Sequence, residues 1–134
     1  MRTLLNLILC FSIAAGSMQA QDIATTSLTW KVNQLKDLNT TASMPYMCSF
    51  NTGGGNQIEW LQKNNFNTTL TVTGTTGTWA NVSATGEKVY SISIDGEPGK
   101  LTFEKDATGT YITLDLSQGG GKHLKHRYTV AKVE

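Results

Sequence analysis

The chain is poor in cysteine and in net charge, and each shortage excludes a class of protein. Among its 134 residues are two cysteines, and eleven basic residues face ten acidic ones, which gives a formal net charge of +1. A small domain held together by disulfides needs more cysteines than this. A protein that binds nucleic acid on a basic face needs a larger positive excess. We therefore expect neither a disulfide scaffold nor a nucleic-acid partner.

Long apolar runs are also missing, apart from one near the beginning of the chain. Residues 4–15 are mostly apolar, follow Arg2 and precede a small and polar stretch over residues 16–20. This order is typical of a secretory signal peptide, and about a dozen apolar residues are too few to cross a hydrocarbon core of roughly 30 Å as a helix. We expect residues 1–20 to be removed, with cleavage after Ala20 or Gly16, and no membrane span in the mature chain.

Removal of this leader leaves Cys48 as the one cysteine of the mature chain. Cys10 lies inside the apolar run and follows Leu9, where a lipid-anchored export needs a small residue, so the pattern disfavours a lipid anchor. Without a disulfide the domain must be stable through its core alone. Small domains on the eukaryotic secretory route are usually rich in disulfides. The expected location is therefore the periplasm, the cell surface or the medium of a Gram-negative bacterium.

Threonine and a period-two alternation of apolar and polar residues are abundant. Threonine suits strands, and no apolar pattern of period 3.6 extends beyond about two turns, so the class is all-β. Residues 21–27 are expected to be flexible, residues 28–134 to form a single domain, and residues 33–45 to be a polar connection with at most a short helical turn. The alternation predicts strands at residues 28–32, 46–50, 58–62, 69–73, 78–82, 89–94, 100–105, 111–116 and 124–133.

Eight or nine strands joined mostly by tight turns form an antiparallel meander whose edges must be hidden. The meander can close into an up-and-down barrel or fold over as a two-sheet sandwich. A Greek-key sandwich needs at least one long return connection, and residues 33–45 are the one candidate for it. The sequence therefore favours a small closed barrel, with the sandwich as the alternative.

Three features of the chain resemble the calycin group of barrels, the lipocalin-like proteins. They are a tryptophan on the first strand (Trp30), an arginine on the last strand (Arg127) and the meander between them. Lipocalins carry Gly-x-Trp on the first strand, where this chain has Leu28-Thr29-Trp30. The resemblance implies that Arg127 lies over the Trp30 ring as a structural clasp, a cation–π contact of roughly 0.5–2 kcal/mol. It also implies a barrel that binds a small hydrophobic molecule.

Residues that could carry chemistry are few. The bases that titrate near neutral pH are His123 and His126, and residues three apart on a strand point to opposite faces, so they do not form a metal pair. The acidic residues are scattered, and neither glycine run has the Lys-Ser/Thr of a phosphate loop. We expect no catalytic site, no metal and no cofactor. An enzyme would need His126 exposed in a cleft beside a carboxylate.

The apolar residues on inward positions suffice to fill a small barrel. Eight strands enclose an interior just wide enough for side chains or for one small ligand. Cys48 is interpreted as a buried small hydrophobe. Two functions stay open: binding of a small hydrophobic molecule in the interior, or a protein-interaction module with a solid core, such as a protease inhibitor or a subunit of a surface complex. For a hollow barrel, the predicted pocket lining is Trp60, Tyr90, Phe103 and His126.

Overall fold

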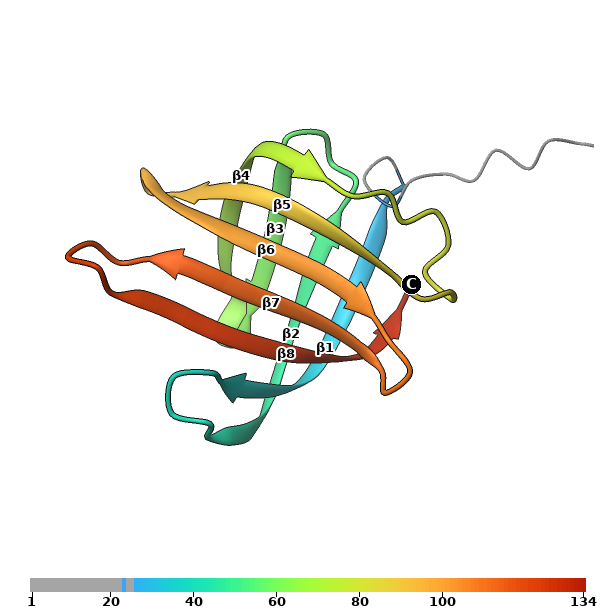
Figure 1. Cartoon of the computed structure of the whole chain (residues 1–134), viewed down its shortest axis with the longest axis horizontal. Coiled ribbons are helices and arrows are strands. Elements are labelled where there is room, and N and C mark those ends of the chain that lie inside the picture. Colours follow the sequence, from blue (N-terminus) through green and yellow to red (C-terminus); the bar gives the residue numbers. More distant parts are fainter. Residues whose placement is uncertain (1–22, 24–25) are drawn as a thin grey trace, which may run out of the picture.

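The computed structural model describes residue 23 and residues 26–134. Eight antiparallel strands follow one another around a closed barrel, in which β8 pairs with β1 (Figure 1). This confirms the predicted all-β meander and its closure into a barrel. Among the described residues, no helix has the length and apolar character needed to cross a membrane. The strands are β1 (Leu28–Asp37), β2 (Ser43–Thr52), β3 (Gln57–Gln62), β4 (Phe66–Thr76), β5 (Gly86–Ile94), β6 (Glu97–Lys105), β7 (Thr110–Ser117) and β8 (His123–Val133), and the 3₁₀ turn η1 (Lys63–Asn65) joins β3 to β4.

The predicted polar connection over residues 33–45 is wrong, because both strands extend into it. β1 continues to Asp37, and β2 already begins at Ser43. The register of β1 shifts between Val32 and Gln34 against both neighbouring strands, which marks a β-bulge. The bulge places Val32 and Leu35 on the inner face although they are three residues apart. This interruption hides the second half of β1 from a search for strict alternation.

The predicted strand over residues 78–82 is also wrong, because these residues lie in the loop between β4 and β5. Trp79 turns inward from this loop and is only 2% exposed. Its indole N–H donates to the Ala84 carbonyl at 3.0 Å. A side-chain carbon at Gly86 would collide with the indole ring, so the first residue of β5 must be glycine for this packing.

The loop and Ile23 together cover one end of the barrel, which we call the closed end. Ile23 is 1% exposed and donates its backbone N–H to the Trp79 carbonyl at 3.0 Å. It belongs to the segment 21–27, for which the sequence predicts flexibility. The buried Lys88 donates from Nζ to the Gly77 carbonyl at 2.8 Å on the same loop. The signal peptide predicted over residues 1–20 lies outside the described residues.

The opposite end, which we call the open end, has no such cover among the described residues. Because the strands alternate in direction, it carries the β1–β2 hairpin, η1, the β5–β6 turn and the β7–β8 loop. Inward positions near this end are only partly buried, for example Tyr46, Cys48 and His126. The two ends of the barrel therefore differ in how completely the core is shielded.

Aromatic rings in mutual contact run through the interior from the closed end toward the open end. Successive centroids are close enough for direct ring contact. We call this series the ring chain. It consists of Trp79, Trp30, Phe103, Phe50, Trp60 and Tyr128, with successive centroid separations of 5.6, 4.8, 6.4, 5.5 and 6.0 Å.

Candidate functional site

The four residues predicted to line a pocket take two different positions. Phe103 and Tyr90 lie in the core, 0% and 4% exposed, with ring centroids 5.4 Å apart. Trp60 and His126 lie nearer the open end, and both rings contact Tyr128, at 6.0 and 6.1 Å between centroids. The structure thus brings Trp60 and His126 together around one tyrosine and places the other pair deeper in the barrel.

Around Tyr128, the inner face of the open end holds several polar groups. Tyr46 donates from its hydroxyl to Gln62 Oε1 at 3.2 Å, and Gln62 Nε2 donates to Thr68 Oγ1 at 3.2 Å. Burial raises the pKa of the Cys48 thiol to about 11. A thiol with so high a pKa stays protonated near neutral pH and is a poor nucleophile. The open end therefore offers hydrogen-bonding groups but no activated cysteine.

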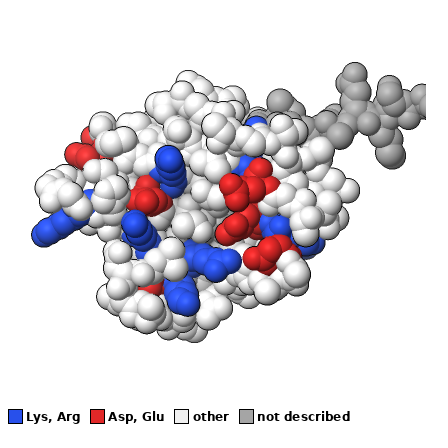
Figure 2. Space-filling view, viewed as in Figure 1, with Lys and Arg blue, Asp and Glu red and all other residues white. Residues whose placement is uncertain are grey.

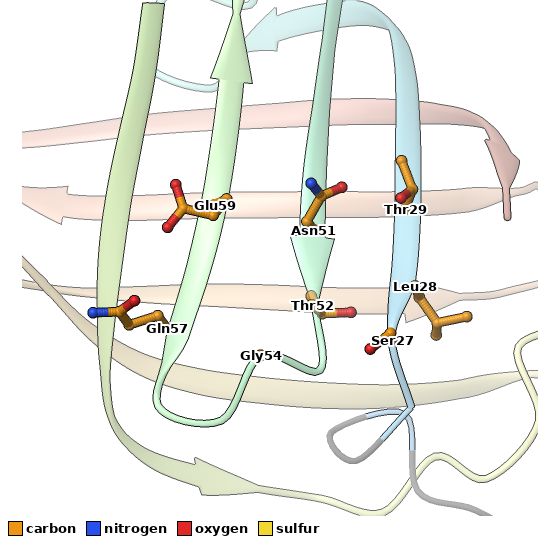
Figure 3. A pocket seen from close by; sticks show the side chains of 8 residues that line it. All are labelled: Ser27, Leu28, Thr29, Asn51, Thr52, Gly54, Gln57 and Glu59. Atoms are coloured by element: carbon orange, nitrogen blue, oxygen red, sulfur yellow. The ribbon is translucent and has the colours of Figure 1, made fainter.

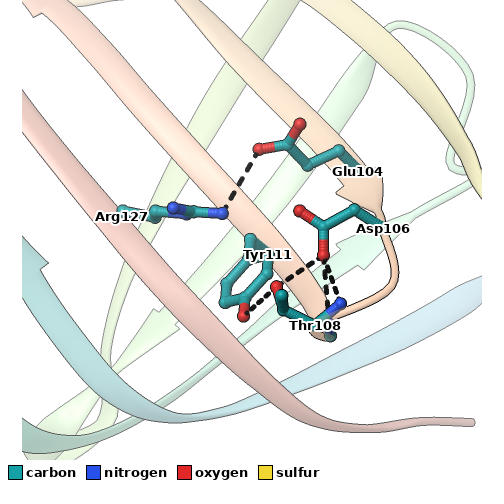
Figure 4. A network of polar contacts seen from close by, with 6 residues as sticks. Glu104, Asp106, Thr108, Tyr111 and Arg127 are labelled. Atoms are coloured by element: carbon teal, nitrogen blue, oxygen red, sulfur yellow. Dashed lines mark hydrogen bonds and ion pairs between the residues drawn. The ribbon is translucent and has the colours of Figure 1, made fainter.

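Arg127 lies on the outer face of the barrel and not over Trp30. Its guanidinium carbon is 3.8 Å from the centroid of the Tyr111 ring, and Nη2 is 3.8 Å from Glu104 Oε1 (Figure 4). Trp30 points inward and donates from Nε1 to Thr52 Oγ1 at 2.9 Å. Neighbouring residues on a strand point to opposite faces, and Tyr128 occupies the inward position. The structure therefore has an outer clasp on Tyr111 where the resemblance implied one across the barrel end.

The outer clasp continues into the β6–β7 turn (Figure 4). The hydroxyls of Tyr111 and Thr108 lie 2.9 Å apart, and the Thr108 backbone N–H donates to Asp106 Oδ1 at 2.7 Å. Hydrogen bonds from the Thr108 side chain and backbone lower the pKa of the Asp106 carboxyl. These contacts order the turn, while Arg127 Nε is buried without a hydrogen-bond partner among the described residues.

His126 faces Asp37 in the β1–β8 register, but no hydrogen bond or ion pair joins the two side chains among the described residues. His123, by contrast, contacts a carboxylate. Its Nδ1 is 2.7 Å from Asp115 Oδ1 across the β7–β8 pair. Ser117 lies directly opposite His123 in the register, but its Oγ accepts a long bond from the Gly119 N–H at 3.5 Å, and no bond to His123 is present among the described residues. Nucleophilic catalysis needs that serine–histidine contact. An open hollow of about 360 Å³ at this place is lined by Pro98, Gly99, Lys100, Asp115, Ser117 and His123.

A second hollow of about 390 Å³ lies beside the first three strands near the closed end (Figure 3). Asn51 Oδ1 is buried there with no hydrogen-bond partner in the described part of the chain. Glu59, which also lines the hollow, accepts a hydrogen bond from Thr69 Oγ1 at 3.0 Å. Its described lining holds one carboxylate and several hydroxyl groups, but no histidine or cysteine. Its lining consists of Ser27, Leu28, Thr29, Asn51, Thr52, Gly54, Gln57 and Glu59.

Metal ligands do not gather anywhere in the described residues, since no three His, Cys, Asp or Glu side chains come together in a way that could hold an ion. The sequence missed the His123–Asp115 contact because it depends on which residues of β7 and β8 face each other. The alternation of inward and outward side chains along each strand places positions 115, 117 and 123 on the outer faces of their strands. Only the register shows that these faces are adjacent.

The arrangement of eight antiparallel strands in sequence order around a closed barrel fits a calycin-like topology. No model of a known protein family matches the chain, and neither a curated protein nor a solved structure matches it. The assignment of a site therefore depends on the geometry of this barrel alone.

Proposed function

We propose that this protein is an exported interaction module with a solid core, which binds its partner through its outer surface. The observation that carries the proposal is the ring chain, which occupies the interior from Trp79 to Tyr128. An eight-stranded barrel has room for side chains or for one small ligand, and here aromatic side chains take that room. The structure supports this function better than the alternative of a carrier for a small hydrophobic molecule.

The exposed apolar side chains also support the proposal. Leu38, Met44, Met47 and Phe66 are 38%, 47%, 63% and 65% exposed. Single exposed apolar residues are common, but several that gather in one region mark an interaction site. All four belong to elements that meet at the open end of the barrel. The partner is therefore proposed to bind there.

Two measurements test the proposal. Native mass spectrometry of the purified protein, incubated with a lipid extract, is expected to show the mass of the polypeptide alone. A photo-crosslinking residue at Met47 is expected to give adducts with a macromolecule in the host cell, while the same residue at Thr75, exposed near the closed end, gives none. A stoichiometric small hydrophobic ligand that displaces part of the core would refute the proposal, as would equal adducts at both positions.

A further inference from the structure

The exposed apolar residues of the open end stand on two neighbouring connections. Leu38 lies in the turn of the β1–β2 hairpin, and Met44 lies on the first part of β2. Phe66 begins β4, directly after η1. The two connections are adjacent around the barrel because β2 and β3 are neighbours. At the closed end, by contrast, Ile23 and Trp79 are buried.

The β1–β2 hairpin projects beyond the neighbouring strand. β2 pairs with β3 only from Ser49 to Asn51, so within the described part of the chain the first half of β2, with Met47, has no strand beside it on that edge. In Figure 1 the hairpin extends below the rest of the barrel. Its exposed side chains therefore project from the barrel and can contact a surface on this side of the open end.

Cations flank this hairpin. Lys36 pairs in register with Arg127 of β8, and the Leu38 N–H donates to the Lys125 carbonyl at 2.9 Å. Lys122 precedes β8 in the β7–β8 loop, and Lys63 stands in η1 three residues before Phe66. The basic residues thus lie on both sides of the apolar hairpin.

These lysines are available to an external anion. Lys36, Lys63, Lys122 and Lys125 form no ion pair within the described residues. Asp115 faces Lys125 in the register, but its carboxylate is bonded to His123 instead. In Figure 2, basic side chains predominate on the left and lower part of the face, toward the open end, and acidic ones gather on the right, toward the closed end.

The remaining connection of the open end has the opposite character. The β5–β6 turn carries Asp95 and ends at Glu97, and both are exposed. In the order of strands around the barrel, this turn lies across from the β1–β2 hairpin. An anionic surface would therefore attract the hairpin side and repel the turn, which fixes the tilt of the barrel.

We infer that the open end docks on an anionic membrane surface, with the apolar side chains of the β1–β2 hairpin and Phe66 among the lipid headgroups and the flanking lysines on the lipid phosphates. The inference rests on the proposed function, because a solid core leaves the outer surface for binding. A soluble polyanion would leave the apolar side chains exposed, and an apolar protein surface would leave the lysines without counter-charges. An anionic bilayer meets both needs, because its charged headgroups lie directly above its acyl chains.

The test is co-sedimentation of the purified mature protein with vesicles of phosphatidylcholine, with and without phosphatidylglycerol. We expect binding to the anionic vesicles that weakens as salt is raised, and little binding to the neutral ones. Lys36→Gln with Lys125→Gln should lower the partition coefficient by about 25-fold, since each charge near an anionic surface contributes about fivefold. Met47→Ser should lower it several-fold without affecting the core.

The matched control is Lys31→Gln with Lys132→Gln, which removes the same charge near the closed end, where both lysines pair with Glu134. This variant should bind as the unaltered protein does. Equal losses in both double variants, salt-independent binding, or no binding to anionic vesicles would overturn the inference. A protein adduct at Met47 without vesicle binding would also overturn it, and would leave the proposed interaction module standing.

Discussion

The two ends of this barrel are formed by the same strands but differ in how far the core is covered. At the closed end a loop folds back and places Trp79 over the core, and Ile23 is held to it by a backbone hydrogen bond. At the open end Met47 and Phe66 remain more than half exposed. The difference teaches that this chain protects its core at one end and presents apolar groups at the other. The surface proposed for binding is thereby separate from the region that covers the core.

The strongest test of this division is Trp79→Ala. Loss of a buried tryptophan whose ring packs against Trp30 should lower the free energy of unfolding by about 3–5 kcal/mol. Phe66→Ala at the open end should change it by less than about 0.5 kcal/mol, as exposed positions usually do. Urea unfolding followed by circular dichroism measures both. Equal losses in the two variants would remove the distinction between the ends.

A smaller effect is expected from Gly86→Ala. The added methyl group meets the Trp79 indole, so the loop must shift, which should cost about 1–3 kcal/mol. Gly74→Ala is the matched control, because among the described residues no heavy atom beyond its chain neighbours lies within 4 Å of the added methyl group, and its backbone is not in the left-handed region. Thermal unfolding of the two variants is the measurement. If the Gly86→Ala protein unfolds at the same temperature as the unaltered protein, the contact between Gly86 and the Trp79 ring is not needed for stability.

The smallest effect concerns the open end at alkaline pH. The pKa of Cys48 is raised from 9.0 to about 11 in the folded protein, so its contribution to stability is complete below about pH 9 and is lost as the pH rises toward 11. The loss should be about 1–2 kcal/mol, since the thiol is partly exposed to solvent. Urea unfolding between these pH values should show the decline, and Cys48→Ala should reduce it. An unchanged decline in that variant would assign the effect to other groups.

Burial likewise raises the pKa of Tyr128, with smaller contributions from Cys48 and Tyr46. As for Cys48, a raised pKa in the folded protein means that stability is lost as the pH rises. The free energy of unfolding of the Cys48→Ala protein should therefore continue to fall above pH 10. Tyr128→Phe, which keeps the ring in the ring chain, is expected to reduce that decline, and Tyr46, whose pKa burial also raises, accounts for a remaining part.

Local patterns predicted most of the strands because alternation reports which face of a strand is buried. They failed where the pattern is broken or imitated. The bulge after Val32 breaks it, so the second half of β1 was missed. The stretch around Trp79 shows the alternation of a strand without being one. A large apolar residue between polar ones gives this pattern even when, as here, the residue covers the end of the barrel from a loop.

Site residues were harder to predict than strands. Trp60, Tyr90, Phe103 and His126 were identified as inward-facing, and the structure places the first three in the core and His126 partly buried at the open end. The alternation along a strand predicts which side chains point inward, but it does not predict whether they surround an empty space or fill it. The positions of Arg127 on Tyr111 and of His123 on Asp115 depend on strand register, which pairs residues that are distant in the chain.

The sequence by itself determined the β class, the meander and the inward set of side chains, because these follow from local alternation and short turns. Only the tertiary structure decided that aromatic rings fill the interior, that Trp79 and Ile23 close one end, and that apolar and basic groups meet at the other. These features depend on which strands are neighbours and on how they are shifted against each other. The loop and the hairpin are local in sequence, but what each covers or leaves exposed is decided by the closure of the barrel.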